Sequence, residues 1–281
     1  MSIFIVARQA AILLAALVVG SPRARAQAAR SVTVYAADYA FTAPDSIPAG
    51  ATTFTLVNRG PSEHHLVMFA LPVGMTLARL DHLMRTDSTD GSGSDGTGII
   101  KVGGMDLAAG SDSASALLDL APGTYVLTCL LPLPDGSGTH RMRGMFRALT
   151  VVPSSRSRTA TPRADAVVHM TDYAFDAPMT LKAGRRVVRF ENAGKHPHMA
   201  IVRRLAPGKT LGDEAAWATR PTGPEPSIAA GGATDLAPGR ASVNVLDLEP
   251  GRYFIVCAAT EGTAPKMHFQ VGMVREFTVA P

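Results

Sequence analysis

The sequence lacks the features that mark several common classes of protein. Its 281 residues contain only two cysteines, Cys129 and Cys257, so only one intramolecular disulfide can form. After Gly20, no apolar run reaches the length of a membrane-spanning helix. The chain also lacks a nucleophile-elbow motif, a paired-carboxylate motif and a phosphate-binding glycine loop. From these missing motifs we expect a protein that is not an enzyme.

The first residues have the pattern of a secretory signal peptide. Arg8 precedes a short apolar run at residues 10–20, and "ARA" ends at Ala26 in the small-residue pattern of a cleavage site. The apolar run is too short to span a bilayer. We therefore expect residues 1–26 to be removed by cleavage after Ala26. The protein is then periplasmic or extracellular, without a membrane span.

Charge does not single out a partner. Removal of residues 1–26 takes away three arginines and no acid, so the formal charge falls from +4 to +1. A nearly neutral chain gives no electrostatic reason to expect nucleic acid or an anionic membrane as partner. The sequence leaves the oligomeric state open.

The chain contains an internal repeat. "DYAFTAPDSIPAG" at residues 38–50 recurs as "DYAFDAPMTLKAG" 134 residues later. Further on, "LDLAPGTYVLTC" at residues 118–129 recurs as "LDLEPGRYFIVC" 128 residues later. We expect two homologous domains joined by a Pro/Ser/Arg-rich linker at residues 153–165. The predicted domains cover residues 31–152 and 166–281.

The apolar residues of both units come in short runs. Runs such as "VTVYA", "TTFTLVN" and "GTYVLTCLL" are separated by proline and glycine, which indicates many short strands. Only residues 76–85 and 210–220 have a helical pattern. The repeated Asp-Tyr-Ala-Phe segments suggest strand packing, with their aromatic residues in or beside the cores. We predict an all-β protein with one Greek-key β-sandwich per unit.

Four residue types recur together at fixed spacing in the two units. In each unit ten residues separate a Cys from a His, four more separate that His from a Met, and another His opens a strand earlier in the unit. Strand ends of a Greek-key sandwich can meet at one pole. Two imidazoles, a thiolate and a weak axial thioether are the ligands of blue copper sites. The candidate metal ligands are His64, Cys129, His140, Met145, His198, Cys257, His268 and Met273.

On these motifs, both units resemble the cupredoxins, the plastocyanin-like family of blue copper proteins. The resemblance rests on "NRGPSEHH" and "NAGKHPH" for the first His, and on the Cys, His and Gly-Met that precede the last strands "FRALTVV" and "VREFTVA". It covers nearly all of both units. It implies two tandem sandwiches, each with copper held near one end by its four candidate ligands. The loop from Cys to the second His is longer here than in small blue copper proteins.

Other interpretations of these residues remain open. Cys129 and Cys257 could form a disulfide with each other. The methionines could fill the cores, with the histidines at the surface. Cys and His are also ordinary zinc ligands, which allows a zinc or generic metal site. We expect four nearby residues to be exposed and without a role at the sites: His65, His196, Met142 and Met267.

The motifs also bear on the function of such a protein. Laccase-like oxidases and copper nitrite reductases resemble one another in carrying extra histidines, including one next to the copper-binding Cys. Here Cys129 is flanked by Thr128 and Leu130, so a trinuclear or type 2 centre is not expected. We expect a copper protein that exchanges single electrons with a redox partner protein. The alternatives are a copper storage or delivery protein and a metal-free β-sandwich binding module.

Overall fold

A computed structural model of the chain describes residues 29–86, 95–106, 113–155, 162–260 and 266–281. The expected signal peptide at residues 1–26 lies outside the described residues, and so does part of the expected linker. In the part of the chain that the structure describes, no helix is long and apolar enough to cross a membrane.

The first half of the chain forms short strands, one helix and a 3₁₀ turn. The elements are β1 (Arg30–Ala37), β2 (Ala40–Thr42), β3 (Ser46–Pro48), β4 (Gly50–Asn58), β5 (Leu66–Leu71), α1 (Leu77–Arg85), β6 (Ile100–Met105), β7 (Ser113–Leu120), β8 (Gly123–Thr128), η1 (His140–Arg143) and β9 (Phe146–Val152). β4 shows why these segments are strands. Its alternate residues Thr52, Phe54 and Leu56 are buried while their neighbours are half-exposed, which is the two-residue period of a strand with one face toward the core.

The second half repeats the same order of elements. They are β10 (Ala166–Thr171), β11 (Ala174–Asp176), β12 (Thr180–Lys182), β13 (Gly184–Asn192), β14 (His198–Leu205), α2 (Leu211–Thr219), β15 (Ser227–Leu236), β16 (Ala241–Leu248), β17 (Gly251–Val256), η2 (His268–Val271) and β18 (Val274–Ala280). Both predicted helices are present and begin after N-cap threonines, Thr76 and Thr210. The predicted fold class, all-β with two tandem Greek-key sandwiches, is confirmed.

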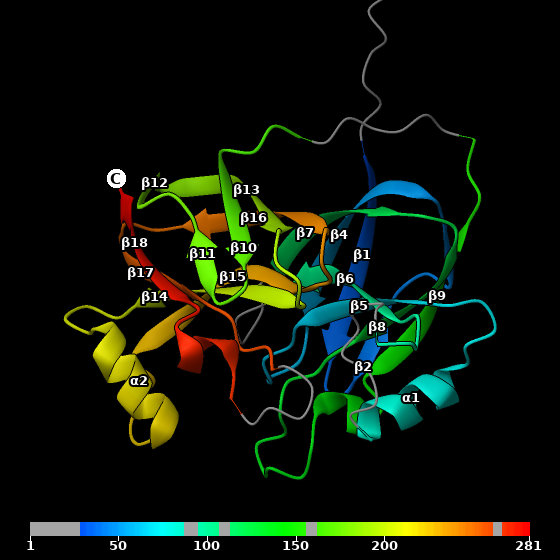
Figure 1. Cartoon of the computed structure of the whole chain (residues 1–281), viewed down its shortest axis with the longest axis horizontal. Helices are drawn as coiled ribbons and strands as arrows, with labels where there is room; N and C mark the ends of the chain where they lie inside the picture. The colour runs from blue at the N-terminus through cyan, green and yellow to red at the C-terminus, as the bar shows by residue number, and fades with distance from the viewer. Residues whose placement is uncertain (1–28, 87–94, 107–112, 156–161, 261–265) are drawn as a thin grey trace, which may run out of the picture.

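The two sandwiches share their sheets (Figure 1). One sheet has the order β11-β10-β13-β16-β7-β4-β1-β2, and the other has the order β12-β18-β17-β14-β15-β6-β5-β8-β9-β3. The halves meet where β16 pairs with β7 and where β15 pairs with β6. Each half keeps its own apolar core between the two layers. Both layers therefore run without a break from one half to the other.

Buried polar groups hold the seam between the halves together. Asn244 donates hydrogen bonds to the carbonyl groups of Gly104 (3.0 Å) and Gly232 (2.8 Å), one from each half. The hydroxyl of Thr234 donates to the carbonyl of Leu66 at 3.0 Å. A Cβ on Gly104 would lie only 2.5 Å from the Thr234 hydroxyl oxygen, so this approach requires glycine. Because these buried groups are paired, the seam carries little desolvation cost.

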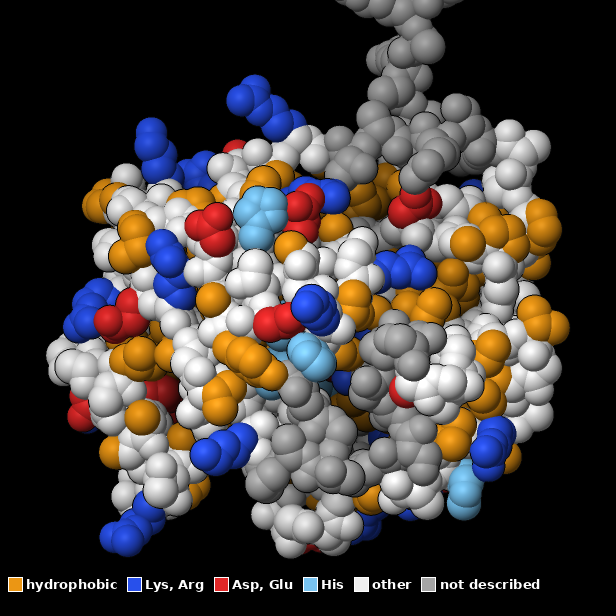
Figure 2. Space-filling model, in the orientation of Figure 1, with side chains coloured by type: hydrophobic (Ala, Val, Ile, Leu, Met, Phe, Trp, Pro, Cys, Tyr) orange, Lys and Arg blue, Asp and Glu red, His pale blue; other side chains and the backbone are white. Residues whose placement is uncertain are grey.

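The two helices differ in what they cover. Leu80 and Leu83 of α1 pack on the outer face of β5 and β8, in a small apolar cluster separate from the main core. α2 has no buried residue. Where β5 presents Phe69 to its helix, β14 has Arg203, whose guanidinium lies 3.8 Å from the Glu214 carboxylate of α2. Figure 2 shows charged side chains of both signs interspersed over one face of the molecule.

Candidate metal centres

The ligand-bearing segments of the first half meet at one end of the sandwich. β8 runs antiparallel to both β5 and β9, with Thr128 opposite Val67 and Phe146. The end of β8 therefore lies beside the beginnings of β5 and β9. Cys129 directly follows β8 and Met145 directly precedes β9, while His64 lies two residues before the first residue of β5.

A hairpin accommodates the long loop between Cys129 and His140. Pro132 and Thr139 form an antiparallel bridge, and the His140 N–H donates to the Leu131 carbonyl at 2.9 Å. The extra residues thus project as a hairpin while its ends stay paired. The Cys129 N–H also donates to the Met145 carbonyl at 3.2 Å. The loop returns His140 to Cys129 despite its length.

The second half repeats these backbone contacts. The Cys257 N–H donates to the Met273 carbonyl at 3.2 Å, and the His268 N–H donates to the Ala259 carbonyl at 2.8 Å. An isolated bridge between Thr260 and Met267 corresponds to the one in the first hairpin. The backbone thus places the repeated Cys, His and Met residues in the same way twice.

Two imidazoles and a thiol converge in the first half. The Nδ1 atoms of His64 and His140 are 3.2 Å apart, and the Cys129 Sγ lies 3.5 Å from the His140 Nδ1. These three side chains are almost fully buried. Met145 is 0 % exposed and belongs to the same core cluster as Cys129, and its N–H donates to the His140 carbonyl at 3.2 Å.

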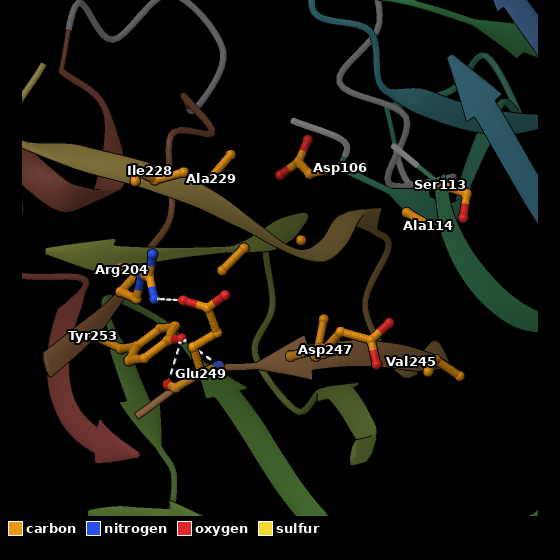
Figure 3. Close-up of a pocket in the computed structure, with 13 residues that line it drawn as sticks. Asp106, Ser113, Ala114, Arg204, Ile228, Ala229, Val245, Asp247, Glu249 and Tyr253 are labelled. Carbon is orange, nitrogen blue, oxygen red and sulfur yellow. Dashed lines mark hydrogen bonds and ion pairs between the residues drawn. The ribbon is translucent and has the colours of Figure 1, made fainter. Parts of the chain in front are cut away.

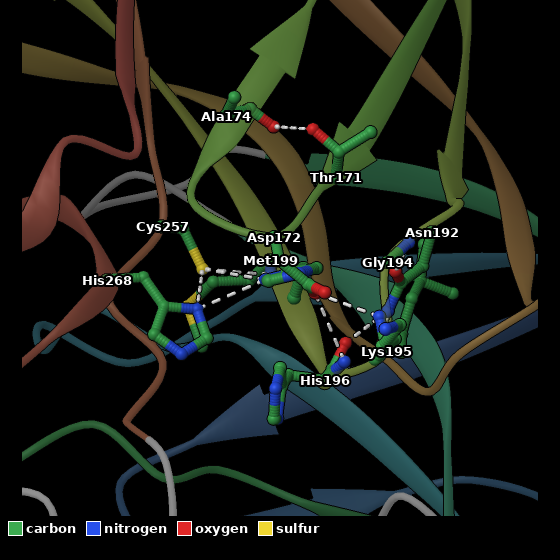
Figure 4. A network of polar contacts seen from close by, with 12 residues as sticks. Thr171, Asp172, Ala174, Asn192, Gly194, Lys195, His196, Met199, Cys257 and His268 are labelled. Atoms are coloured by element: carbon green, nitrogen blue, oxygen red, sulfur yellow. Dashed lines mark hydrogen bonds and ion pairs between the residues drawn. The ribbon is translucent and has the colours of Figure 1, made fainter.

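The second half has nearly the same geometry (Figure 4). The Nδ1 atoms of His198 and His268 are 3.1 Å apart, and the Cys257 Sγ lies 3.4 Å and 3.9 Å from the Nδ1 atoms of His268 and His198. Met273 is buried as Met145 is. In each half the ligand atoms of the two His and the Cys lie within 4.8 Å of one another.

A carboxylate fixes the orientation of the first His at each centre. Asp38 Oδ1 lies 3.0 Å from the Nε2 of His64, and Asp172 Oδ1 lies 3.1 Å from the Nε2 of His198. A carboxylate accepts at this contact, so Nε2 carries the proton and Nδ1 turns its lone pair toward the centre. The Asp-Tyr-Ala-Phe segments were predicted only to pack as strands, and this role of their aspartates was not predicted. The signal was available, since 25 residues separate the Asp from the His in both halves.

The tyrosines after these aspartates cover the second His. Tyr39 and Tyr173 have positive φ angles of 52° and 66°, an uncommon conformation for a bulky residue. Their rings meet His140 and His268 edge-on, with centroid separations of 5.1 Å and 5.3 Å. The Asp-Tyr pair thus contacts both histidines of its centre.

A glycine allows the carboxylate to approach. The Asn58 side chain accepts from the Gly60 N–H at 2.9 Å and donates to the Ser62 carbonyl at 2.7 Å, which folds a tight turn before His64. A Cβ on Gly60 would lie 2.6 Å from Asp38 Oδ1 and 3.3 Å from His64 Nε2. The repeated Asn-x-Gly therefore leaves room for the Asp–His contact.

Burial sets the protonation states of the donor atoms. Burial lowers the pKa of His64 and of His140, so both imidazoles are neutral at pH 7. Burial raises the pKa of Cys129 to about 11, although N–H groups of His65 and Leu131 partly counter it. Burial raises the pKa of Cys257 to about 11 in the same way. Without a cation the thiols keep their protons, and a metal ion would take the place of those protons.

The donor set fits copper. Two imidazole nitrogens and one thiolate, with a buried thioether alongside, suit both Cu(I) and Cu(II). Zinc would also accept the nitrogen and sulfur donors but not the thioether. Cys129 and Cys257 are free and lie in separate centres, so the alternative of a disulfide between them is not observed.

Two Greek-key sandwiches, each with a His, Cys, His and Met set at one end, make this a two-domain cupredoxin-like fold. No protein-family model and no curated protein sequence matches the chain. Among solved structures, reduced auracyanin from Roseiflexus castenholzii is 18 % identical, with 45 % of this chain and 100 % of that chain covered and a TM-score of 0.31. A blue copper oxidase from Nitrosomonas europaea is 15 % identical (90 % and 86 % covered, TM-score 0.27). A copper nitrite reductase from the same organism is also 15 % identical (90 % and 94 % covered, TM-score 0.25).

The prediction that the protein is not an enzyme is wrong. The solved structures similar to nine-tenths of the chain include a blue copper oxidase and a copper nitrite reductase, which are enzymes. The prediction relied on missing linear motifs. In a metalloenzyme the reactive group is the ion itself, and its ligands come from distant parts of the chain. The absence of a nucleophile or carboxylate motif therefore does not exclude an enzyme.

The four residues near the ligands that were expected to be exposed, His65, His196, Met142 and Met267, differ in their solvent exposure. Met142 and Met267 are exposed, at 39 % and 41 %, and His196 is half-buried. The expectation that His65 is exposed is wrong, since it is only 9 % exposed. Its ring contacts the Asp106 carboxylate and the Leu130 N–H, so its neighbours fix it inside the protein.

A separate cavity of about 350 Å³ lies at the seam, between β7, β15 and β16 (Figure 3). Its lining includes Asp106, Asp247 and the ion pair of Arg204 with Glu249. The Tyr253 hydroxyl donates to the Glu249 carbonyl at 2.8 Å. Much of its polar lining is thus already paired within the protein.

Proposed function

We propose that the protein binds one copper ion in each half and transfers single electrons through these type 1-like centres. The convergence of two Nδ1 atoms and one Sγ in each half carries this proposal. The ligands are His64, Cys129, His140 and Met145 in the first centre, and His198, Cys257, His268 and Met273 in the second. We further propose export by the expected signal peptide and a protein redox partner.

The residues around each centre favour a fixed geometry. Bound copper supplies reversible one-electron chemistry. Asp38 and Asp172 hold the first His in the tautomer that offers Nδ1. The Met199 N–H donates to the Cys257 Sγ at 3.4 Å, and such donors stabilise a thiolate. The paired hairpin ends and the buried surroundings exclude water and keep the ligands in place.

Copper titration of single-centre variants tests the proposal. The wild type should bind two copper ions with an intense thiolate-to-copper absorption band, and Cys129→Ser and Cys257→Ser should each bind one. Met267→Leu is a matched control, because this Met is exposed beside His268 and should not alter the spectrum. Electron spin resonance of each variant then reports on one centre at a time.

The same titration distinguishes the other functions. Tight, colourless Cu(I) binding without a stable Cu(II) form would indicate storage or delivery. Tighter binding of zinc than of copper would indicate a zinc site. Absence of metal binding in all three proteins would refute the copper proposal and leave a metal-free β-sandwich module.

A further inference from the structure

The two centres share their ligand set but differ in the residues that hold the ligand segments. The residue after the first His is His65 in one centre and Met199 in the other. The residue after the second His is Arg141 in one centre and Phe269 in the other. At both positions the first centre has a side chain that forms strong hydrogen bonds, His or Arg. The second centre has Met, whose sulfur is a weak acceptor, or Phe, whose side chain forms none.

Arg141 ties the second His of the first centre to a helix. Its backbone N–H donates to the Cys129 carbonyl at 2.9 Å, so it is part of the ligand segment. Its side chain is only 5 % exposed and forms an ion pair with Asp81 of α1. α1 is itself anchored on the outer face of the sheet by Leu80 and Leu83. Opening this segment would break the Arg141–Asp81 ion pair and leave Asp81 with only Arg85, four residues further along α1, as its partner.

His65 forms a second tie at the same centre. Its Nε2 accepts from the Leu130 N–H at 2.7 Å, directly after Cys129. Its Nδ1 lies 3.3 Å from Asp106 Oδ1, so that nitrogen carries the proton and donates to the carboxylate. The first His segment and the Cys segment are thus connected through a buried side chain.

Among the residues that the structure describes, the second centre has the shared contacts without counterparts of these two ties. The Phe269 N–H donates to the Cys257 carbonyl at 2.9 Å, as in the first centre. Asp172 also supports the first His, and accepts from the Lys195 N–H at 2.8 Å. The centres therefore differ at the residues that follow the two histidines, which are His65 and Arg141 in the first centre and Met199 and Phe269 in the second. α2 has no buried residue, and its Glu214 faces Arg203.

We propose that the first centre retains its metal ion while the second exchanges it, with Arg141 and His65 as the positioning residues that make the difference. This division rests on the proposed copper function. The physical basis of this division is that the ligand segment of the first centre opens more slowly. This opening rate is a property of the polypeptide, so it can be measured without bound metal.

Thiol modification of the reduced, metal-free protein tests the opening rates. Both thiols are fully buried, at 0 % exposure, so each reacts only when its segment opens. Cys257 should react with an alkylating reagent at least about tenfold faster than Cys129, the lower end of the usual effect of such supporting contacts. Peptide mass spectrometry measures both rates in one sample. Equal rates, or faster modification of Cys129, would overturn the proposal.

Variants then assign the effect. Arg141→Phe gives the first centre the residue of the second and should raise the Cys129 rate toward that of Cys257, while Arg141→Lys should retain most of the protection. The control Arg143→Ala removes an exposed arginine two residues away and should change neither rate. If Arg141→Phe melts early, the double variant Asp81→Asn/Arg141→Met removes the pair without an unpaired charge. An unchanged Cys129 rate in that folded double variant would refute the role of Arg141.

Copper release completes the test. A chelator should remove copper from Cys129→Ser, which keeps only the second centre, at least about tenfold faster than from Cys257→Ser. Equal release would overturn the division of roles. If neither variant binds copper, the proposed function fails. The alkylation rates of Cys129 and Cys257 would still show whether the first ligand segment opens more slowly than the second.

Discussion

Metal binding should displace one proton from each centre. Burial raises the pKa of Cys129 and of Cys257 to about 11, so at pH 8 only about one thiol in a thousand is ionised in the metal-free protein. Copper binds the thiolate, and the proton must leave. The histidines of the first centre add none, because burial lowers the pKa of His64 and of His140 and both are neutral at this pH.

The apparent affinity should therefore rise about tenfold per pH unit at each centre between pH 7 and pH 10. Calorimetric titration with Cu(I), under anaerobic conditions and in two buffers of different ionisation enthalpy, measures the protons directly. We expect two protons per chain for the wild type and one for Cys129→Ser. A wild type that releases no proton, or a variant that releases as many as the wild type, would show that the cysteines are not ligands.

Three further predictions concern the supporting residues. Asp38→Asn should weaken copper binding at the first centre by about 10- to 100-fold, measured by chelator competition, while the exposed control Asp45→Asn should not. Gly60→Ala should weaken the same centre, because the added Cβ would lie 2.6 Å from Asp38 Oδ1; an unchanged spectrum would contradict this. Asn244→Ala should lower the free energy of unfolding by about 1–3 kcal/mol in urea, since it leaves buried carbonyl groups at the seam unpaired.

The internal repeat is what made the candidate ligands visible in the sequence. A lone Met145 or His64 would have been indistinguishable from a core or surface residue, but recurrence at constant spacing identified them together. The helices were predictable for a local reason, since Thr76 and Thr210 cap them from within the segment. Features that depend on the local sequence, such as the repeated ligand spacing and the helix caps, could therefore be predicted.

The supporting contacts were not predictable, because their partners are distant in the chain. Arg141 meets Asp81 from 60 residues away, and nothing in the local sequence indicates that an arginine there is buried. His65 looked like a surface residue for the same reason. The seam was also hidden, since Thr234 and Asn244 are polar residues that become buried only when the halves join.

Because the two sheets are shared, the inner strands of each half pair with strands of the other half. A chain cut within residues 153–165 would yield pieces whose inner strands, β6 and β7 or β15 and β16, have lost partners across the seam. Exposed strand edges of this kind recruit other chains and aggregate. Deletion of either half should therefore yield a product that associates through its open strand edges rather than a stable single sandwich.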